Sequence, residues 1–151
     1  MVDPRGERSK RMLYGRFEHT IDAKNRMFIP AKYKEALESS FKLTFNGLEK
    51  CIMVYSNREW EKYEESLTTL PPLQFADYIR EVYSNTVDVQ IDSQGRVVIP
   101  QFLKEQVEIE KNVVVVGVGN HIEIWSKDVF DAKRKNINMD EIKRAMIGMG
   151  L

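Results

Sequence analysis

The sequence predicts a mixed α/β chain, mainly β, built from two copies of one unit. Residues 21–30 read IDAKNRMFIP, and seventy positions later residues 91–100 read IDSQGRVVIP. Without a gap, residues 21–60 match residues 91–130 at 11 of 40 positions. A repeated unit of this size cannot bury its apolar face alone, so we expect the copies to pack on each other with pseudo-two-fold symmetry.

The opening elements of each copy follow from hydrophobic pattern. In residues 14–21, Phe17, His19 and Ile21 alternate with polar neighbours, which is typical of a half-buried strand. In the first copy we expect strands at 14–21, 27–29, 41–45 and 51–55, a tight loop at 22–26, and helices at 31–39 and about 57–67. In the second copy we expect strands at 97–99, 113–116 and 121–125 and a helix at 101–107.

Residues with special backbone preferences mark the boundaries in both copies. Proline suits a helix start, glycine or asparagine suits a left-handed turn, and serine suits a helix N-cap. The matched pairs are Pro30 and Pro100 at the short helices, Asn25 and Gly95 in the tight loops, Gly47 and Gly117 in the hairpins, and Ser56 and Ser126 as N-caps. The same local structure is therefore predicted twice.

This pattern divides the chain into five parts. We expect a flexible N-terminal arm at 1–11, a first repeat at 12–70, a connecting helix at 71–83, a second repeat at 84–130 and a C-terminal helical tail at 131–151. In the tail, Asn138 and Glu141 form a capping-box pattern. Met139, Ile142, Met146 and Ile147 line one face of that helix, which predicts packing against the core or a partner.

Composition limits the class of protein. The 151 residues are 42% hydrophobic and 30% charged, as in a globular protein with a real core. No apolar run approaches the roughly 20 residues of a membrane span and no secretory leader opens the chain, so we expect a cytoplasmic protein. The single cysteine, Cys51, excludes an intrachain disulfide and is predicted to be a small buried strand residue rather than a catalytic thiol.

Charge is balanced overall but unevenly distributed. The formal net charge is +0, yet residues 1–36 carry +4, residues 37–130 carry −6 and residues 131–151 carry +2. An asymmetric chain can present a local basic face although its total charge is zero. This excludes a bulk electrostatic binder of nucleic acid but allows a binder that gathers a few basic loops.

Each copy presents one Asp-x-x-x-Arg loop between two strands. An arginine fork can make two parallel hydrogen bonds to a phosphate or to guanine O6 and N7, and the aspartate can brace the loop by accepting backbone amides. The alternative is a structural Asp–Arg pair that only closes a turn. For an isolated loop the structural interpretation is preferable, but the duplication of Ile-Asp-x-x-x-Arg-x-x-Ile-Pro makes the pattern specific.

These repeats resemble the MraZ family of bacterial DNA-binding regulators, within the AbrB-like swapped-hairpin β-barrel superfamily. The resemblance covers residues 12–130 and is carried by Leu13-Tyr14-Gly15, both Asp-x-x-x-Arg loops with their Ile-Pro pairs, Trp60, Val114–Gly117 and Ile122–Trp125. It implies a duplicated swapped-hairpin β-barrel with short flanking helices. It also implies a nucleoid-associated ring of protomers, octamer-like, that controls and usually represses the promoter preceding the division and cell-wall gene cluster. The expected partner is double-stranded DNA carrying tandem short G-containing boxes.

The resemblance assigns the candidate site residue by residue. The DNA-contacting residues would be Arg26, Lys24, Asn25, Arg96 and Gln94, and the loop-bracing residues would be Asp22 and Asp92. Only the first loop carries an extra cation, because Gln94 stands where the first loop has Lys24. We therefore expect Arg26 and Lys24 to be the stronger contacts, with Arg96 secondary and partly structural. Asn25 stands where the family commonly has glycine, and it tolerates the same backbone.

No pattern typical of an enzyme, a metal centre or a cofactor site is found in the sequence. Gly117-Val118-Gly119 lacks a third glycine and is followed by a strand, so a nucleotide-binding loop is not predicted. His19, His121 and Cys51 have no ligand spacing that would hold a metal. Neither a membrane nor a small-molecule substrate is expected as a partner. Two non-enzymatic alternatives stay open: a scaffold ring without a specific DNA site, and an AbrB-like antitoxin-type binding module.

Overall fold

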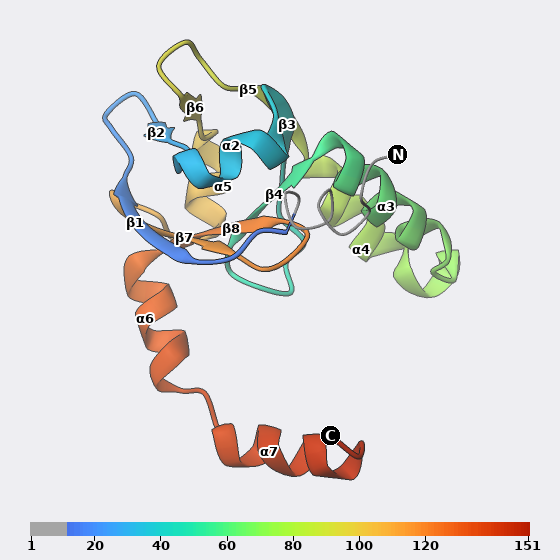
Figure 1. Cartoon of the computed structure of the whole chain (residues 1–151). Helices are drawn as coiled ribbons and strands as arrows, with labels where there is room; N and C mark the ends of the chain where they lie inside the picture. Colours follow the sequence, from blue (N-terminus) through green and yellow to red (C-terminus); the bar gives the residue numbers. More distant parts are fainter. Residues whose placement is uncertain (1–11) are drawn as a thin grey trace, which may run out of the picture.

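The computed structural model describes residues 12–151, so the predicted arm at 1–11 lies outside the described residues. The chain forms short strands and helices in the order that the duplication predicts (Figure 1). The first copy contains β1 (Arg16–Thr20), β2 (Arg26–Phe28), α2 (Ala31–Leu37), β3 (Ser40–Thr44), β4 (Ile52–Ser56) and α3 (Asn57–Thr68), and α4 (Pro72–Ser84) follows it. The second copy contains β5 (Val87–Gln90), β6 (Arg96–Val98), α5 (Gln101–Gln106), β7 (Asn112–Gly117), β8 (Ile122–Ser126) and α6 (Lys127–Lys135), and α7 (Met139–Gly148) ends the chain.

The two copies exchange strands. A six-stranded antiparallel sheet has the order β1-β7-β8-β4-β3-β5, and β2 pairs with β6 in a separate two-stranded ribbon. Thus β1 of the first copy pairs with β7 of the second, while β5 of the second copy pairs with β3 of the first. The equivalent strands β4 and β8 pair with each other at the centre. The predicted class, mainly β with two interlocked copies, is confirmed.

The predicted barrel is not closed. β1 and β5 are the two edges of the sheet, and no strand pairing within residues 12–151 joins them. The β2–β6 ribbon instead lies over the concave side of the sheet, together with α2 and α5 (Figure 1). The physical reason is that β2 and β6 leave the sheet after each tight loop and satisfy their backbone groups with each other. Only the expected closure of the barrel is wrong, because the exchange of strands between the two copies is observed.

The principal core fills the space between the sheet, the ribbon and the two short helices. Its fully buried side chains come from every layer: Met27 and Val97 from the ribbon, Tyr33, Leu37 and Leu103 from the short helices, and Leu43, Val113 and Ile124 from the sheet. Burying one such aliphatic side chain stabilises a fold by roughly 1.5–3 kcal/mol. Because both copies contribute equally placed residues, neither copy has this core by itself.

A second core joins the α3–α4 hairpin to the other face of the sheet. Trp60, Leu67 and Val82 from the helices are buried against strand residues that include Tyr55 and Trp125. The Ser56 hydroxyl accepts the N–H of Glu59 at 3.2 Å, which confirms the predicted N-cap of α3. Helix α3 has a counterpart in α6 of the second copy, but α4 packs back and buries Val82, whereas α7 has no buried residue, and this difference is a departure from two-fold symmetry.

The C-terminal arm consists of α6 and α7. The Ser126 side chain caps α6 by accepting the N–H of Val129, and the Asn138 side chain caps α7 by accepting the N–H of Glu141 at 3.0 Å. Both caps agree with the sequence. In Figure 1, α6 leads away from the sheet and α7 continues beneath the body of the molecule. The apolar face predicted for this helix is exposed within the chain, with Met139 at 64% and Ile147 at 63%.

Candidate nucleic-acid interface

An aspartate closes the first loop from within. The Asp22 Oδ1 atom accepts the backbone N–H groups of Lys24 and Arg26, both at 2.9 Å. The Asp22 N–H donates to the Arg26 carbonyl at 2.9 Å, which completes the turn. Asn25 adopts a left-handed conformation with φ 61°. A carboxylate that satisfies two amides fixes the loop backbone before any ligand arrives.

The second loop has the same geometry. Asp92 Oδ1 accepts the N–H of Gln94 at 2.9 Å and of Arg96 at 2.8 Å. Gly95 takes the left-handed position with φ 82°. The backbone N–H of each arginine, followed by its side chain, lowers the pKa of the paired aspartate from its ordinary value. Both aspartates therefore carry a negative charge at neutral pH.

The same aspartates orient the two arginine side chains. Asp22 Oδ2 accepts Nε of Arg26 at 2.8 Å, and Asp92 Oδ2 accepts Nε of Arg96 at 2.9 Å. The arginine side chains are 31% and 20% exposed. Within residues 12–151, no ion pair other than the one with its own aspartate engages either guanidinium. The structural pair and a binding role are thus compatible, because Nε holds the fork in place while the two Nη groups can serve a ligand.

Strand exchange brings the two loops together. Ile29 of the first copy donates its N–H to the Gly95 carbonyl at 3.1 Å, and Ile99 donates to the Asn25 carbonyl at 2.7 Å. The β2–β6 ribbon continues from these bonds, with Arg26 opposite Val98 and Phe28 opposite Arg96. Figure 1 shows both loops projecting from the same side of the molecule. The two arginines therefore belong to one surface although they are seventy residues apart.

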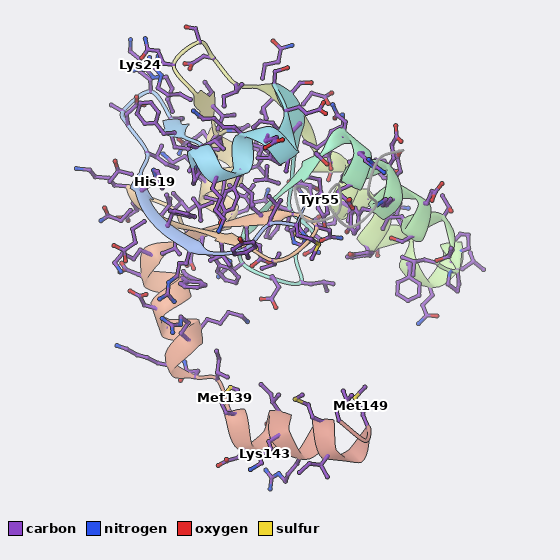
Figure 2. The ribbon with its side chains drawn as sticks, viewed as in Figure 1. His19, Lys24, Tyr55, Met139, Lys143 and Met149 are labelled. Carbon is purple, nitrogen blue, oxygen red and sulfur yellow. The ribbon has the colours of Figure 1, made fainter. Side chains whose placement is uncertain are left out.

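The other candidate residues divide into exposed and internally engaged ones. Lys24 and Gln94 are exposed at equivalent positions of the two loops, and Figure 2 marks Lys24 at the outer end of the first. Asn25 is different, because its Oδ1 accepts from Lys104 Nζ at 2.7 Å and its Nδ2 donates to Gln101 Oε1 at 3.3 Å. These contacts tie Asn25 to helix α5 of the other copy, so a DNA contact by its side chain would compete with them.

Sequence reasoning missed Phe28 and Val98, two exposed apolar residues on this surface. Met27 points inward and is 1% exposed, whereas its neighbour Phe28 is 52% exposed. In the second copy Val98 is 55% exposed in the same way. Alternation along a strand was the available signal, because the inward position of Met27 requires Phe28 to point outward beside Arg26. The outer face of the ribbon thus interleaves two arginines with two apolar side chains.

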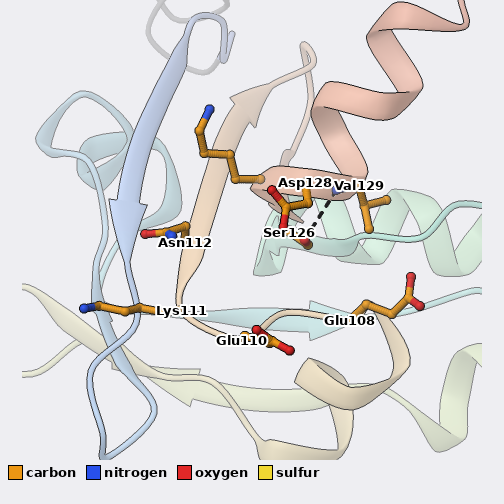
Figure 3. Close-up of a pocket in the computed structure, with 8 residues that line it drawn as sticks. Glu108, Glu110, Lys111, Asn112, Ser126, Asp128 and Val129 are labelled. Atoms are coloured by element: carbon orange, nitrogen blue, oxygen red, sulfur yellow. Dashed lines mark hydrogen bonds between the residues drawn. The ribbon is translucent and has the colours of Figure 1, made fainter.

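A groove beside the start of α6 has a different character. It has a volume of about 320 Å³ and lies between the α5–β7 connection and the start of α6 (Figure 3). Its walls mix both signs of charge, from Glu108, Glu110 and Asp128 to Lys111 and Lys127. A phosphate would meet three carboxylates and only two ammonium groups there. The groove therefore does not compete with the paired loops as an anion site.

The residues weighed as possible metal ligands or nucleophiles are not gathered into a site. Among residues 12–151, no group of three or more His, Cys, Asp or Glu side chains could hold a metal ion. Cys51 is 1% exposed, and burial raises the pKa of its thiol, so it is held protonated. His121 stacks on Tyr55 at 4.6 Å between ring centroids. In the part of the chain that is described, no helix is long and apolar enough to cross a membrane.

Comparison with known proteins gives one consistent result. The family described as "MraZ protein, putative antitoxin-like" matches residues 12–76 and 82–148. A protein from Caldanaerobacter subterraneus subsp. tengcongensis, "Transcriptional regulator MraZ", is 44% identical over 136 residues, which cover 87% of this chain and 94% of that protein. A protein of the same name from Acetivibrio thermocellus is 35% identical over 147 residues, 93% of this chain and 100% of that one. Among solved structures, PHS018 from Pyrococcus horikoshii is 18% identical, covers 74% of this chain and 87% of that chain, and superposes with a TM-score of only 0.29.

Proposed function

Because the chain belongs to the MraZ family, we propose that it is a transcriptional regulator that binds specific double-stranded DNA through its paired Asp-x-x-x-Arg loops. The observation that carries this proposal is the twofold occurrence of one loop geometry on a single surface. In both loops an aspartate fixes the backbone and holds the arginine Nε at 2.8–2.9 Å. Among the described residues, each guanidinium is paired with its own aspartate alone, so its Nη groups are left for a ligand on the side to which both loops project.

Recognition would use the arginine forks. A guanidinium fixed through Nε keeps its planar edge available for a phosphate or for guanine O6 and N7. Each good bidentate contact to a base contributes about 1–3 kcal/mol of discrimination. Lys24 would add a phosphate contact at the first loop, and Gln94 would offer only a neutral hydrogen-bonding group at the second. Short boxes that contain guanine are the targets that suit this chemistry.

We propose further that the protein acts as a ring-shaped homo-oligomer, octamer-like, on tandem boxes in the promoter of the division and cell-wall gene cluster. One protomer offers few cations and therefore modest affinity. Neighbouring protomers on successive boxes would raise affinity through effective concentration, without new kinds of contact. The resulting occupancy would block the promoter, so the expected sign of regulation is repression.

The first experiment is a gel-shift titration on DNA from upstream of this protein's own gene. Wild type is compared with Arg26→Ala and Arg96→Ala after gel filtration has shown equal assembly. Discrete shifts that unrelated DNA competes poorly, and that Arg26→Ala loses, would support specific regulation through the first loop. A correctly assembled wild type that gives no shift would overturn the proposal in favour of a scaffold or partner-binding protein.

Varying the number of intact boxes in the DNA tests how much assembly of the protein contributes to its affinity. Scrambling every box except one is expected to weaken binding by orders of magnitude, since avidity depends on simultaneous engagement. Affinity should also fall steeply with salt because phosphate contacts release counterions. If a single intact box binds as tightly as the tandem array, the avidity mechanism is wrong even though the DNA contact stands.

A further inference from the structure

The outer face of the β2–β6 ribbon places each arginine directly across from an apolar side chain of the opposite copy. In the antiparallel register Arg26 lies opposite Val98, and Phe28 lies opposite Arg96. The pair between these two faces the core. Phe28 and Val98 point the other way and are 52% and 55% exposed. In Figure 1 both strands lie at the base of the paired loops, so this face belongs to the candidate DNA surface.

The hydrogen bonds of the ribbon determine how close these side chains lie. The Ile29 N–H donates to the Gly95 carbonyl at one end of the ribbon, and the equivalent bond of the other copy closes the opposite end. Hydrogen-bonded and non-hydrogen-bonded pairs alternate along an antiparallel ladder, so both arginine–apolar pairs are non-hydrogen-bonded ones. The Cα atoms of such a pair are about 4.5 Å apart, the closer of the two spacings. A ligand held by either arginine is therefore within reach of an apolar side chain.

The groups on this face match the major-groove edge of DNA better than they match a phosphate alone. A phosphate gains nothing from a phenyl ring or an isopropyl group beside the arginine. In the major groove, guanine offers two acceptors to an arginine fork, and thymine offers the apolar C5-methyl group. The groove also admits a two-stranded β-ribbon. Two residues along a strand span about 6.6–6.8 Å, close to two base-pair steps of roughly 3.4 Å each, so the apolar contact falls within about two base pairs of the guanine.

The difference between the two apolar residues shows which chemistry they share. An aromatic ring can stack on an unpaired base, as in proteins that bind single strands. Val98 occupies the equivalent position of the second copy and has no π face. Contact with a methyl group is open to both side chains, whereas stacking is open to Phe28 alone. A duplex therefore suits both copies better than a single strand does.

We propose that Phe28 and Val98 contact thymine C5-methyl groups in the major groove, each beside the guanine that the arginine opposite contacts. The proposal rests on the proposed function and deepens it, because it adds a required thymine to each guanine-containing box. Phe28 with Arg96 reads one thymine–guanine neighbourhood, and Val98 with Arg26 reads the other. The phenyl ring covers more of a methyl group than the isopropyl group does, so Phe28 contributes more to thymine selection.

Replacing thymine by deoxyuridine tests the contact, because it removes the methyl group and leaves base pairing intact. The DNA upstream of this protein's own gene is amplified once with dTTP and once with dUTP. Fluorescence anisotropy then measures the affinity of the full-length protein for each product. Wild type should bind the thymine DNA about fourfold more tightly for each methyl group that it buries. Equal affinity for the two DNAs would overturn the proposal.

Variants of the ribbon assign the methyl contacts to the two side chains. Phe28→Ala should lose the greater part of the preference for thymine DNA, Val98→Ala the smaller part, and the double variant all of it. Phe28→Val, which copies the second strand, should keep a preference. Leu73→Ala is the matched control and should behave as wild type, because Leu73 is 100% exposed on α4, away from the ribbon. A full preference in the double variant would show that DNA stiffness distinguishes the two DNAs, and would overturn the proposal.

Arg26→Ala and unrelated competitor DNA separate this inference from the proposed function. A wild type that binds the thymine DNA specifically and through Arg26, yet binds the uracil DNA equally well, would overturn the methyl contact alone. A wild type that binds neither DNA more tightly than unrelated DNA would overturn both proposals.

Discussion

The two copies have the same backbone at their tight loops but differ at their hairpins, where Gly47 is left-handed and Gly117 is the last residue of strand β7. Gly47 and Gly117 occupy the same position of the repeat, yet they are glycine for different reasons. Gly47 has φ 82°, a left-handed conformation, and a Cβ there would meet nothing closer than 3.8 Å. A Cβ on Gly117 would lie 2.6 Å from the Leu13 carbonyl carbon and against the Tyr14 backbone. One glycine serves conformation, and the other makes room for a passing chain.

The tight loops differ in a related way. Asn25 and Gly95 both take the left-handed position, but only Asn25 has a side chain to receive the lysine of the opposite copy. At Gly95 the Lys34 Nζ atom lies 2.5 Å from where a Cβ would be. The comparison teaches that duplication preserved the backbone of each loop, while the contacts between copies diverged. The chain therefore has two similar candidate DNA-binding loops, which differ in their contacts with the opposite copy and in their charge.

The largest expected difference is between the two hairpin glycines. Gly117→Ala forces backbone against backbone and should lower the free energy of unfolding by about 3 kcal/mol. Gly47→Ala meets only the left-handed penalty, about 1 kcal/mol. Urea denaturation of both variants measures this, with equal m-values as the control that the unfolded states are comparable. Equal losses at the two sites would show that Gly117 is not needed for the passage of Leu13 and Tyr14.

The next largest difference concerns the affinity of the two loops for operator DNA. Arg26→Ala should weaken binding about 30-fold, or about 2 kcal/mol, since it removes one bidentate contact beside Lys24. Arg96→Ala should weaken it less, because the second loop lacks that cation. Fluorescence anisotropy at fixed salt measures both.

Gln94→Lys sharpens the same comparison, since it gives the second loop the cation of the first. It should steepen the slope of log binding constant against log salt concentration by about one released counterion for each second loop that contacts DNA. The matched change Lys24→Gln should flatten that dependence by the same amount. A greater loss in Arg96→Ala than in Arg26→Ala would reverse the assignment of the principal loop.

Exchanging Asn25 and Gly95 tests whether contacts from the opposite copy stabilise the two loops unequally. Asn25→Gly relieves the left-handed backbone but leaves the Nζ of Lys104, a residue only 9% exposed, without its acceptor. We expect a net loss of about 1 kcal/mol in unfolding free energy. Gly95→Asn should be nearly neutral, because Lys34 is flexible at its far end and can move to donate to the new amide. Thermal unfolding monitored by circular dichroism measures both, and a larger loss in Gly95→Asn would contradict this account.

The smallest expected effect is the pH dependence that the two aspartates share. Hydrogen bonds from Arg26 and Arg96 lower the pKa of Asp22 and Asp92 in the folded state. Their stabilising contribution is therefore present above the ordinary aspartate pKa of about 4 and is lost as the pH falls through the lower folded value. Wild type should exceed Asp22→Asn and Asp92→Asn in stability at pH 7, and the difference should shrink below pH 4. A constant difference down to pH 2 would rule out this linkage, and carboxyl NMR titration would locate the two groups.

Several features were predictable because they depend on a few neighbouring residues. The tight loops, the Ser56 and Asn138 caps and the order of strands and helices follow from local backbone preference and hydrophobic pattern. Boundaries moved by one or two residues. Helix α2, for example, was expected to end at residue 39 and ends at Leu37, whereas Pro30 and Pro100 precede the short helices as N-cap residues at the expected starts. Their carbonyls still accept the first helical N–H bonds, from Tyr33 and Leu103.

By itself, the sequence determined that this protein is two copies of one α/β unit, each with an Asp-braced arginine loop. Its residues did not determine which strands would pair; strand exchange entered only through family resemblance. The tertiary structure decided that β2 and β6 form a separate ribbon, that the sheet stays open, and that Asn25 is engaged by Lys104. It also decided that α7 is left exposed. The reason is physical: a turn or a cap is set by a few adjacent residues, whereas pairing and exposure depend on the summed contacts of segments that meet only after the chain has folded.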